Sequence, residues 1–194
     1  MADVSPAEQA PARKLIARAV AGDEVAFAAL YRDVQPRLLR YAASLVGPDA
    51  DDVTSEAWLQ IVRDLPGFAG DLDGFRAWSA RIVRNRALDL LRAAGRRPAR
   101  PTPTHALPEP AAADDTAGSA LDRLSTDAAI GLIASLPREQ SEAVLLRAVV
   151  GLDAKSAGAV LDKSAAAVRV ASHRGLRRLA RMLRDRRPDG VWSG

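Results

Sequence analysis

The chain has 194 residues, of which 48% are hydrophobic and 4% aromatic, and its net charge is +4 at pH 7. This apolar fraction is typical of a folded protein, and many aliphatic but few aromatic residues favour helices over sheets. Because cysteine is absent, disulfides and thiolate metal sites are excluded, and His105 and His173 are too few to form a metal site. No segment approaches 18 consecutive apolar residues, so we expect a soluble, cytoplasmic protein without membrane insertion.

Positive charge is concentrated in two stretches of the sequence. Residues 76–100 hold eight arginines and one acid, and residues 164–187 hold the same numbers. Residues 1–75 instead hold twelve acids and seven bases. Arginine-rich helices can simply be solvated faces, but clustering of this kind indicates two separate contacts with a polyanion.

Two helices are predicted at the start of the chain. A capping box with proline at the first helical position predicts a helix over 5–21, which Gly22 ends. Asp23 can cap a second helix that continues to Val46, because apolar residues recur there at three- and four-residue spacings. Pro36 is expected to kink or interrupt this second helix.

Two further helices complete the first half. A third helix is predicted over about 50–65, with acids in its first turn, where the helix dipole favours them. A glycine-containing loop over 66–74 then leads into a fourth helix, over 75 to about 94. One apolar stripe of this last helix contains Phe75, Trp78 and Ile82.

A proline- and alanine-rich stretch separates the two halves of the chain and is interpreted as a flexible linker. A second set of helices follows, near 119–134, 137–150, 153–161 and 164–186. The predicted fold class is therefore all-α, with two small helical domains joined by a flexible linker. Their boundaries are 1–94 for the first domain, 95–118 for the linker, 119–187 for the second domain and 188–194 for a tail.

The second domain contains the layout of a helix-turn-helix. A short helix ending at Leu161, the turn Asp162–Lys163 and a helix from Ser164 have the spacing of this motif. Apolar residues follow one face of the last helix and arginines follow the other, as expected for a helix that enters the major groove. An amphipathic helix on an acidic protein or membrane surface is the alternative, but that role would not need the preceding short helix and turn.

The segment LPREQSEAVLLRAVVGLDAKSAGAVLDKSAAAVRVASHRGLRRLARML resembles, without gaps, the promoter-binding module of bacterial extracytoplasmic-function (ECF) sigma factors. Asp162 stands where that family usually has a turn glycine. The resemblance implies that this module recognises the minus-thirty-five promoter element. The implied contacts are Lys163, Ser164, Arg169, His173, Arg174 and Arg178.

The first domain resembles the other module of the same family over Phe27–Arg92, through FAALYRDVQPRLLRYAASLVG, DADDVTSEAWLQIVRDL and GFRAWSARIVRNRALDLLR. The resemblance implies that the third helix docks on core RNA polymerase, through Asp51, Asp52, Glu56, Trp58 and Leu59. It also implies that the following loop and helix recognise and melt the minus-ten element, through Phe68, Arg81, Arg84, Asn85 and Arg92. For Trp78 we favour core packing over base stacking.

The predicted function is that of a sigma factor, which binds core RNA polymerase and directs promoter-specific initiation. The predicted partners are core polymerase and promoter DNA, with an anti-sigma protein as a further possible partner. The chain is not expected to be an enzyme or to carry a cofactor, because it has no phosphate loop, nucleophile motif or metal-ligand spacing. The alternative is a conventional helix-turn-helix regulator, with a sensing or dimerisation domain at its N-terminus.

Overall fold

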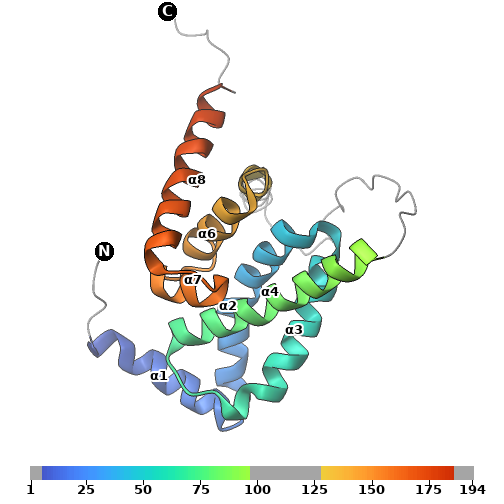
Figure 1. Ribbon diagram of the computed structural model, residues 1–194. Helices are drawn as coiled ribbons and strands as arrows, with labels where there is room; N and C mark the ends of the chain where they lie inside the picture. Colours follow the sequence, from blue (N-terminus) through green and yellow to red (C-terminus); the bar gives the residue numbers. More distant parts are fainter. Residues whose placement is uncertain (1–5, 97–127, 186–194) are drawn as a thin grey trace, which may run out of the picture.

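A computed structural model describes residues 6–96 and 128–185, and all regular structure in these two ranges is helical. The N-terminal group of helices comprises α1 (Pro6–Val20), α2 (Glu24–Val46), α3 (Ala50–Asp64) and α4 (Leu72–Arg96), with a short 3-10 turn on either side of α3. The C-terminal group comprises a short helix over 128–134 followed by α6 (Arg138–Ala148), α7 (Ala154–Leu161) and α8 (Ala165–Asp185). Figure 1 shows the second group against α2 and α4, with α8 projecting away from the first group. The predicted all-α class is confirmed.

The junction between α1 and α2 follows the sequence prediction closely. Gly22 adopts a φ of 88°, a left-handed conformation that costs a glycine little, and it directly follows the turn that ends α1. The backbone N–H of Ala26 donates to the side chain of Asp23 over 3.0 Å, so Asp23 is the N-cap of α2. Arg18 also donates to Asp23, which ties the end of α1 to the start of α2.

Pro36 does not interrupt α2, so that alternative of the sequence prediction is wrong. The proline ring lies on an exposed part of the helix, while Val34 and Leu38 on either side are fully buried. Because α2 packs against α1, α3 and α4, tertiary contacts outweigh the roughly 3 kcal/mol that an interior proline costs a helix.

Helix α4 begins at Leu72, three residues before the predicted start at Phe75. The reason is a cap that the sequence reading missed. The side chain of Asp71 accepts a hydrogen bond from the backbone N–H of Gly74 over 2.8 Å, and its carbonyl oxygen accepts one from Phe75. The helix also ends later than predicted, at Arg96, and so includes the first two residues assigned to the linker.

Most buried apolar residues of both groups belong to one continuous cluster. Within the first group, Leu30, Leu38 and Phe75 are fully buried. Helix α7 packs on α4, and this contact joins the two groups. Among the described helices, none combines the length and apolarity needed to cross a bilayer. The first part of the helix predicted over 119–134, most of the linker and the tail lie outside the described residues.

Asp153 caps the first helix of the helix-turn-helix, since its carboxylate accepts the backbone N–H of Ser156 over 2.7 Å. We expect Asp153→Ala to lower the free energy of unfolding by about 1 kcal/mol, and Asp153→Asn to lower it less. The hydrogen bond from Ser156 holds the pKa of Asp153 below its ordinary value. The extra stability from the carboxylate is therefore complete above the unfolded-state pKa and is lost as the pH falls through the folded-state pKa. Urea unfolding at neutral and acidic pH measures this. The difference in free energy of unfolding between the starting protein and Asp153→Asn should become smaller in acid.

Candidate nucleic-acid and polymerase interfaces

Helix α3 has one buried face and one exposed face. Its buried face, which includes Val53, Ala57 and Ile61, packs into the core. The exposed face carries Asp52, Glu56 and Leu59, which follow one another at helical spacing. Leu59 is 74% exposed and Val62 is 52% exposed, so two large apolar side chains lie in solvent beside carboxylates. Such a surface suits a partner with both apolar and cationic groups.

Trp58, the fourth predicted polymerase contact, lies on the inner side of α3. It is 7% exposed and packs edge-on against Phe27, with ring centroids 6.0 Å apart, and against Tyr31 at 4.7 Å. Its indole N–H donates to the side chain of Gln35 on α2. Trp58 therefore fixes α3 against α2, while Asp51, Asp52, Glu56 and Leu59 are exposed.

The loop before α4 is closed by three aromatic rings. Phe68 lies 5.5 Å from Phe75 and 5.1 Å from Trp78 between ring centroids. Phe75 is fully buried, whereas Phe68 and Trp78 are half-buried. The preference for Trp78 as a packing residue agrees with this cluster. The exposed parts of Phe68 and Trp78 are the aromatic surface that this cluster offers to a nucleobase.

The predicted minus-ten residues on α4 differ in their surroundings. Asn85 and Arg92 are exposed, and Arg92 pairs with Asp89 on the same helix over 3.0 Å. Arg81 and Arg84 instead face the C-terminal group. Arg81 lies 3.5 Å from Asp162, and both of these side chains are largely exposed. Surface pairs of this kind contribute little to stability.

Arg84 is engaged much more firmly, by Glu142 of α6. Its Nε donates to one carboxylate oxygen of Glu142 over 2.7 Å, and Nε of Arg138 donates to the other over 2.7 Å. The Glu142 side chain is 4% exposed and that of Arg84 is 17% exposed. Burial alone would lower the pKa of Arg84, but the hydrogen bond and charge of Glu142 raise it above its ordinary value. Burial, followed by the Glu142 charge, also raises the pKa of the Tyr41 hydroxyl.

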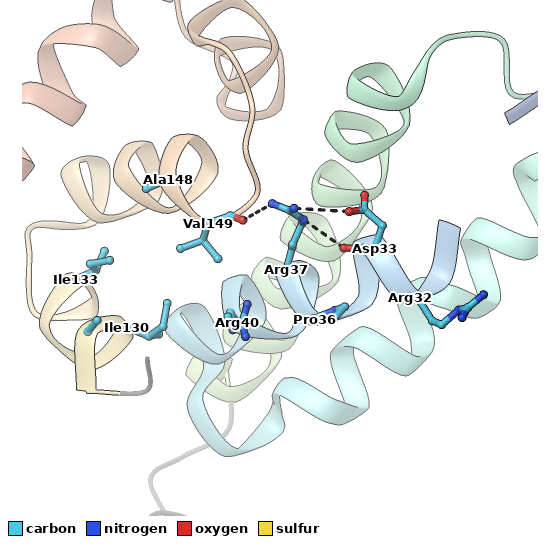
Figure 2. Close-up of a pocket in the computed structure, with 10 residues that line it drawn as sticks. Arg32, Asp33, Pro36, Arg37, Arg40, Ile130, Ile133, Ala148 and Val149 are labelled. Carbon is cyan, nitrogen blue, oxygen red and sulfur yellow. Dashed lines mark hydrogen bonds and ion pairs between the residues drawn. The ribbon is translucent and has the colours of Figure 1, made fainter. Parts of the chain in front are cut away.

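A second contact between the groups lies on α2. Arg37 donates to the carbonyl oxygen of Val149 over 3.3 Å and also pairs with Asp33. Figure 2 shows Arg37 extending from α2 toward the end of α6, across a cleft of about 650 Å³. The apolar wall of this cleft comes from Ile130, Ile133 and Val149, and Arg32 and Arg40 line its other side.

The turn of the helix-turn-helix depends on two unusual positions. Asp162 has a φ of 56°, so a left-handed residue other than glycine ends α7. Gly158 faces the returning chain so closely that an added Cβ would lie 2.5 Å from the carbonyl oxygen of Lys163. Ser164 then caps α8 by accepting the backbone N–H of Ala167 over 3.2 Å. These residues set the direction in which α8 leaves the turn.

The predicted minus-thirty-five residues lie at the start of α8 and along its exposed side. Arg169, His173, Arg174 and Arg178 are all exposed. Lys163 forms an ion pair with Glu139 of α6. Six arginines of this helix are exposed, namely Arg169, Arg174, Arg177, Arg178, Arg181 and Arg184. The opposite face buries Val168, Ser172 and Gly175 against α6 and α7. A cationic helix held in this way presents its arginines to phosphate and base edges.

Three positions that matter for these surfaces escaped the sequence reading. Glu142 directly precedes the apolar run 143–146, and an acid that is buried with such a run requires a charged partner. Gly158 and Gly175 gave no signal beyond low helix propensity. An added Cβ at Gly175 would lie 2.8 Å from Cγ2 of Val144, which shows how closely α8 crosses α6.

Comparison with known families matches each half of the chain. The sigma-70 region 2 family matches residues 30–97, and the sigma-70 region 4 family matches residues 126–179. The ECF RNA polymerase sigma factor SigD of Mycobacterium tuberculosis is 35% identical over 189 residues, covering 91% of this chain and 87% of its own. ShbA of Streptomyces griseus, also an ECF sigma factor, is 38% identical over 176 residues, covering 85% of this chain and 91% of its own.

Two solved structures share the fold. CnrH, solved in complex with the cytosolic domain of CnrY, aligns with a TM-score of 0.62 and 28% identity, over 90% of this chain and 98% of CnrH. The sigma factor RpoE of Bartonella quintana, solved with the anti-sigma factor NepR, shares the fold, with a TM-score of 0.59 and 20% identity, over 83% and 98% of the two chains. The matches to both regions, and relatives of more than 30% identity over most of their length, place this chain in the ECF family of RNA polymerase sigma factors.

Proposed function

We propose that this sigma factor uses three separate surfaces, each carried by one helix. It binds core RNA polymerase and directs promoter-specific initiation, while catalysis belongs to the polymerase. In our assignment, α3 docks on the polymerase, the loop before α4 and α4 itself engage the minus-ten element, and α8 engages the minus-thirty-five element. The first two surfaces belong to a domain over 1–94 and the third to a domain over 119–187.

The assignment of α3 to polymerase binding rests on the exposed side chain of Leu59. A large apolar side chain that is 74% exposed gains little from its present position, but burial against a partner would stabilise a complex by about 1.5 to 3 kcal/mol. Glu56 and Asp52 lie one and two turns earlier on the same exposed stripe. An apolar anchor with carboxylates beside it has the composition of a protein interface rather than of an ordinary solvated helix.

Charge reversal on α3 tests this assignment. We expect Asp52→Lys with Glu56→Lys to weaken binding to core polymerase on the order of tenfold, because each reversal replaces an attraction by a repulsion. The fold should survive, since both side chains are exposed and have no ion-pair partner among the described residues. Binding can be measured by titrating labelled sigma factor with core polymerase in the absence of DNA.

Asp89→Lys is the matched control for each reversal. Asp89 is exposed on α4, and its replacement makes the same change in charge without touching α3. Leu59→Ala should weaken polymerase binding without a change of charge. If Asp52→Lys and Leu59→Ala bind core polymerase as tightly as Asp89→Lys does, α3 is not the docking surface.

Two further assignments complete the proposal. We place the protein in the cytoplasm, because its polymerase partner works there. We also propose that an anti-sigma protein regulates it, since CnrH and RpoE, which share this fold, were each solved with a partner protein, and the partner of RpoE is the anti-sigma factor NepR. Such a partner should compete with core polymerase for the factor, which a binding assay with both proteins present would reveal.

A further inference from the structure

A large apolar side chain lies exposed among the cationic residues at the start of α8. Val170 belongs to the second turn of this helix and is 50% exposed, whereas Val168, two residues earlier, is fully buried. Because successive residues are about 100° apart around an α-helix, Val170 points almost directly away from α6 and α7. Its exposure gains the fold little, since a β-branched residue also favours a helix less than alanine does.

The exposed residues one turn before Val170 also end in methyl groups. Ala166 and Ala167 precede it by four and three positions, so the three side chains are neighbours on the helix surface. We call these three residues the methyl patch. None of its side chains can donate or accept a hydrogen bond, so the patch can recognise a partner only through apolar contact.

Cationic side chains surround the methyl patch. Arg169 directly precedes Val170, and His173 and Arg174 lie one turn beyond it, all of them exposed. Arginines in such positions bind phosphates or guanine edges, and they hold a helix in the major groove. In a helix-turn-helix, the first residues of the second helix contact the base edges. Val170 is in this part of α8 and points away from the core, so it faces the bases.

We propose that Val170, together with Ala166 and Ala167, recognises the C5-methyl group of a thymine in the minus-thirty-five element. This inference rests on the proposed function, in which α8 engages that element. Thymine is the base that presents a methyl group in the major groove, and an apolar side chain can recognise it without a hydrogen bond. Val170 is therefore a specificity-determining residue in addition to the charged contacts of α8.

The experiment begins with promoter duplexes selected from a random pool. Duplexes are kept if core polymerase carrying the full chain binds them and core polymerase alone does not. Each thymine of the enriched upstream element, on either strand, is then replaced by uracil, which differs only in lacking the C5-methyl group. We expect uracil at one or two positions to weaken binding about fourfold, the effect of losing one buried methyl group, and to change binding little elsewhere.

Val170→Ala should remove this discrimination, so that duplexes with thymine and with uracil at the sensitive position bind equally well. The substitution should not weaken α8, because alanine is the better helix former. Val25→Ala is the matched control, since Val25 is an exposed valine of α2, and it should keep the fourfold difference.

Addition of a methyl group tests the same contact in the opposite direction. Cytosine is placed at the sensitive position, and its affinity is compared with that of 5-methylcytosine, which restores the methyl group without restoring thymine. The added methyl group should strengthen binding of the starting protein and of Val25→Ala about fourfold, and it should not affect Val170→Ala.

Arg169→Ala with Arg174→Ala separates this inference from the proposed function. If no upstream element is enriched, or if the element binds equally well without both arginines, α8 does not recognise it and both proposals are wrong. The inference about Val170 alone is overturned if the element depends on the arginines but contains no thymine or tolerates uracil throughout. It is also overturned if Val170→Ala still discriminates thymine from uracil as the starting protein does.

Discussion

Alanine at Arg169 and at Arg174 is expected to weaken binding of duplex minus-thirty-five DNA without a loss of stability. Both side chains are exposed on α8, and neither has an ion-pair partner within the described ranges. Removal of an arginine that recognises a base should weaken binding by about 1 to 3 kcal/mol and relax the base preference at one position of the DNA. Removal of an arginine that binds a phosphate should instead reduce the magnitude of the slope of log affinity against log salt by about 0.9. Titrations at several salt concentrations distinguish the two roles.

Substitutions on α4 should affect promoter melting, whereas those on α8 should affect duplex binding. Arg84→Ala with Asn85→Ala should leave duplex upstream binding nearly intact but reduce open-complex formation about tenfold, the typical effect of losing a charge-assisted hydrogen bond. Permanganate reactivity of unpaired thymines measures this. Arg13→Ala, an exposed arginine of α1, serves as the control. Normal melting by polymerase carrying the double variant would remove α4 from the minus-ten assignment.

A single methyl group at Gly158 is expected to disrupt the helix-turn-helix. The new Cβ would lie 2.5 Å from the carbonyl oxygen of Lys163, and that same residue donates its N–H to the carbonyl oxygen of Gly158 over 2.9 Å. The backbone must therefore move, at a cost of about 1 to 3 kcal/mol. Because Ser164 follows directly and caps α8, the start of the recognition helix moves with it, and every minus-thirty-five contact should weaken together.

Gly131→Ala is the internal control for this substitution. Gly131 lies in the short helix over 128–134, and no atom lies within 4 Å of an added Cβ. Alanine there should be neutral or stabilising by up to about 1 kcal/mol. Urea unfolding and duplex binding compare the two variants. Equal stability and equal DNA affinity would mean that the turn tolerates a side chain at Gly158 and that its close approach is unimportant.

Local features of this fold were predictable because they depend on neighbours in sequence. Asp23 caps α2 as predicted, since an N-cap needs only its own side chain and the next turn of backbone. Asp71 was missed because two glycines nearby marked the segment as a loop and no capping-box partner follows it. Pro36 was misjudged because local propensity predicts an interruption, whereas burial of the residues around it decides the outcome.

The sites show the same division between local and long-range information. The exposed stripe of α3 and the arginine face of α8 follow from helical periodicity, so their residues could be named from the sequence. Trp58 was grouped with the exposed residues, but its inward direction is set by contacts with α2. The contact of Arg84 with Glu142 joins two domains across 58 positions, and no periodic pattern reports such a distance in sequence.

The charges of the two ends of the molecule are separated in space as well as in sequence. Helix α3 carries exposed carboxylates and α8 carries six exposed arginines. Figure 1 shows these two helices on opposite sides of the molecule. The field of the α8 arginines therefore orients the protein toward a polyanion before any contact is made. A DNA duplex should attract the α8 end first and leave the α3 end pointing outward. The association rate constant should consequently fall as salt is added, while the dissociation rate constant changes much less.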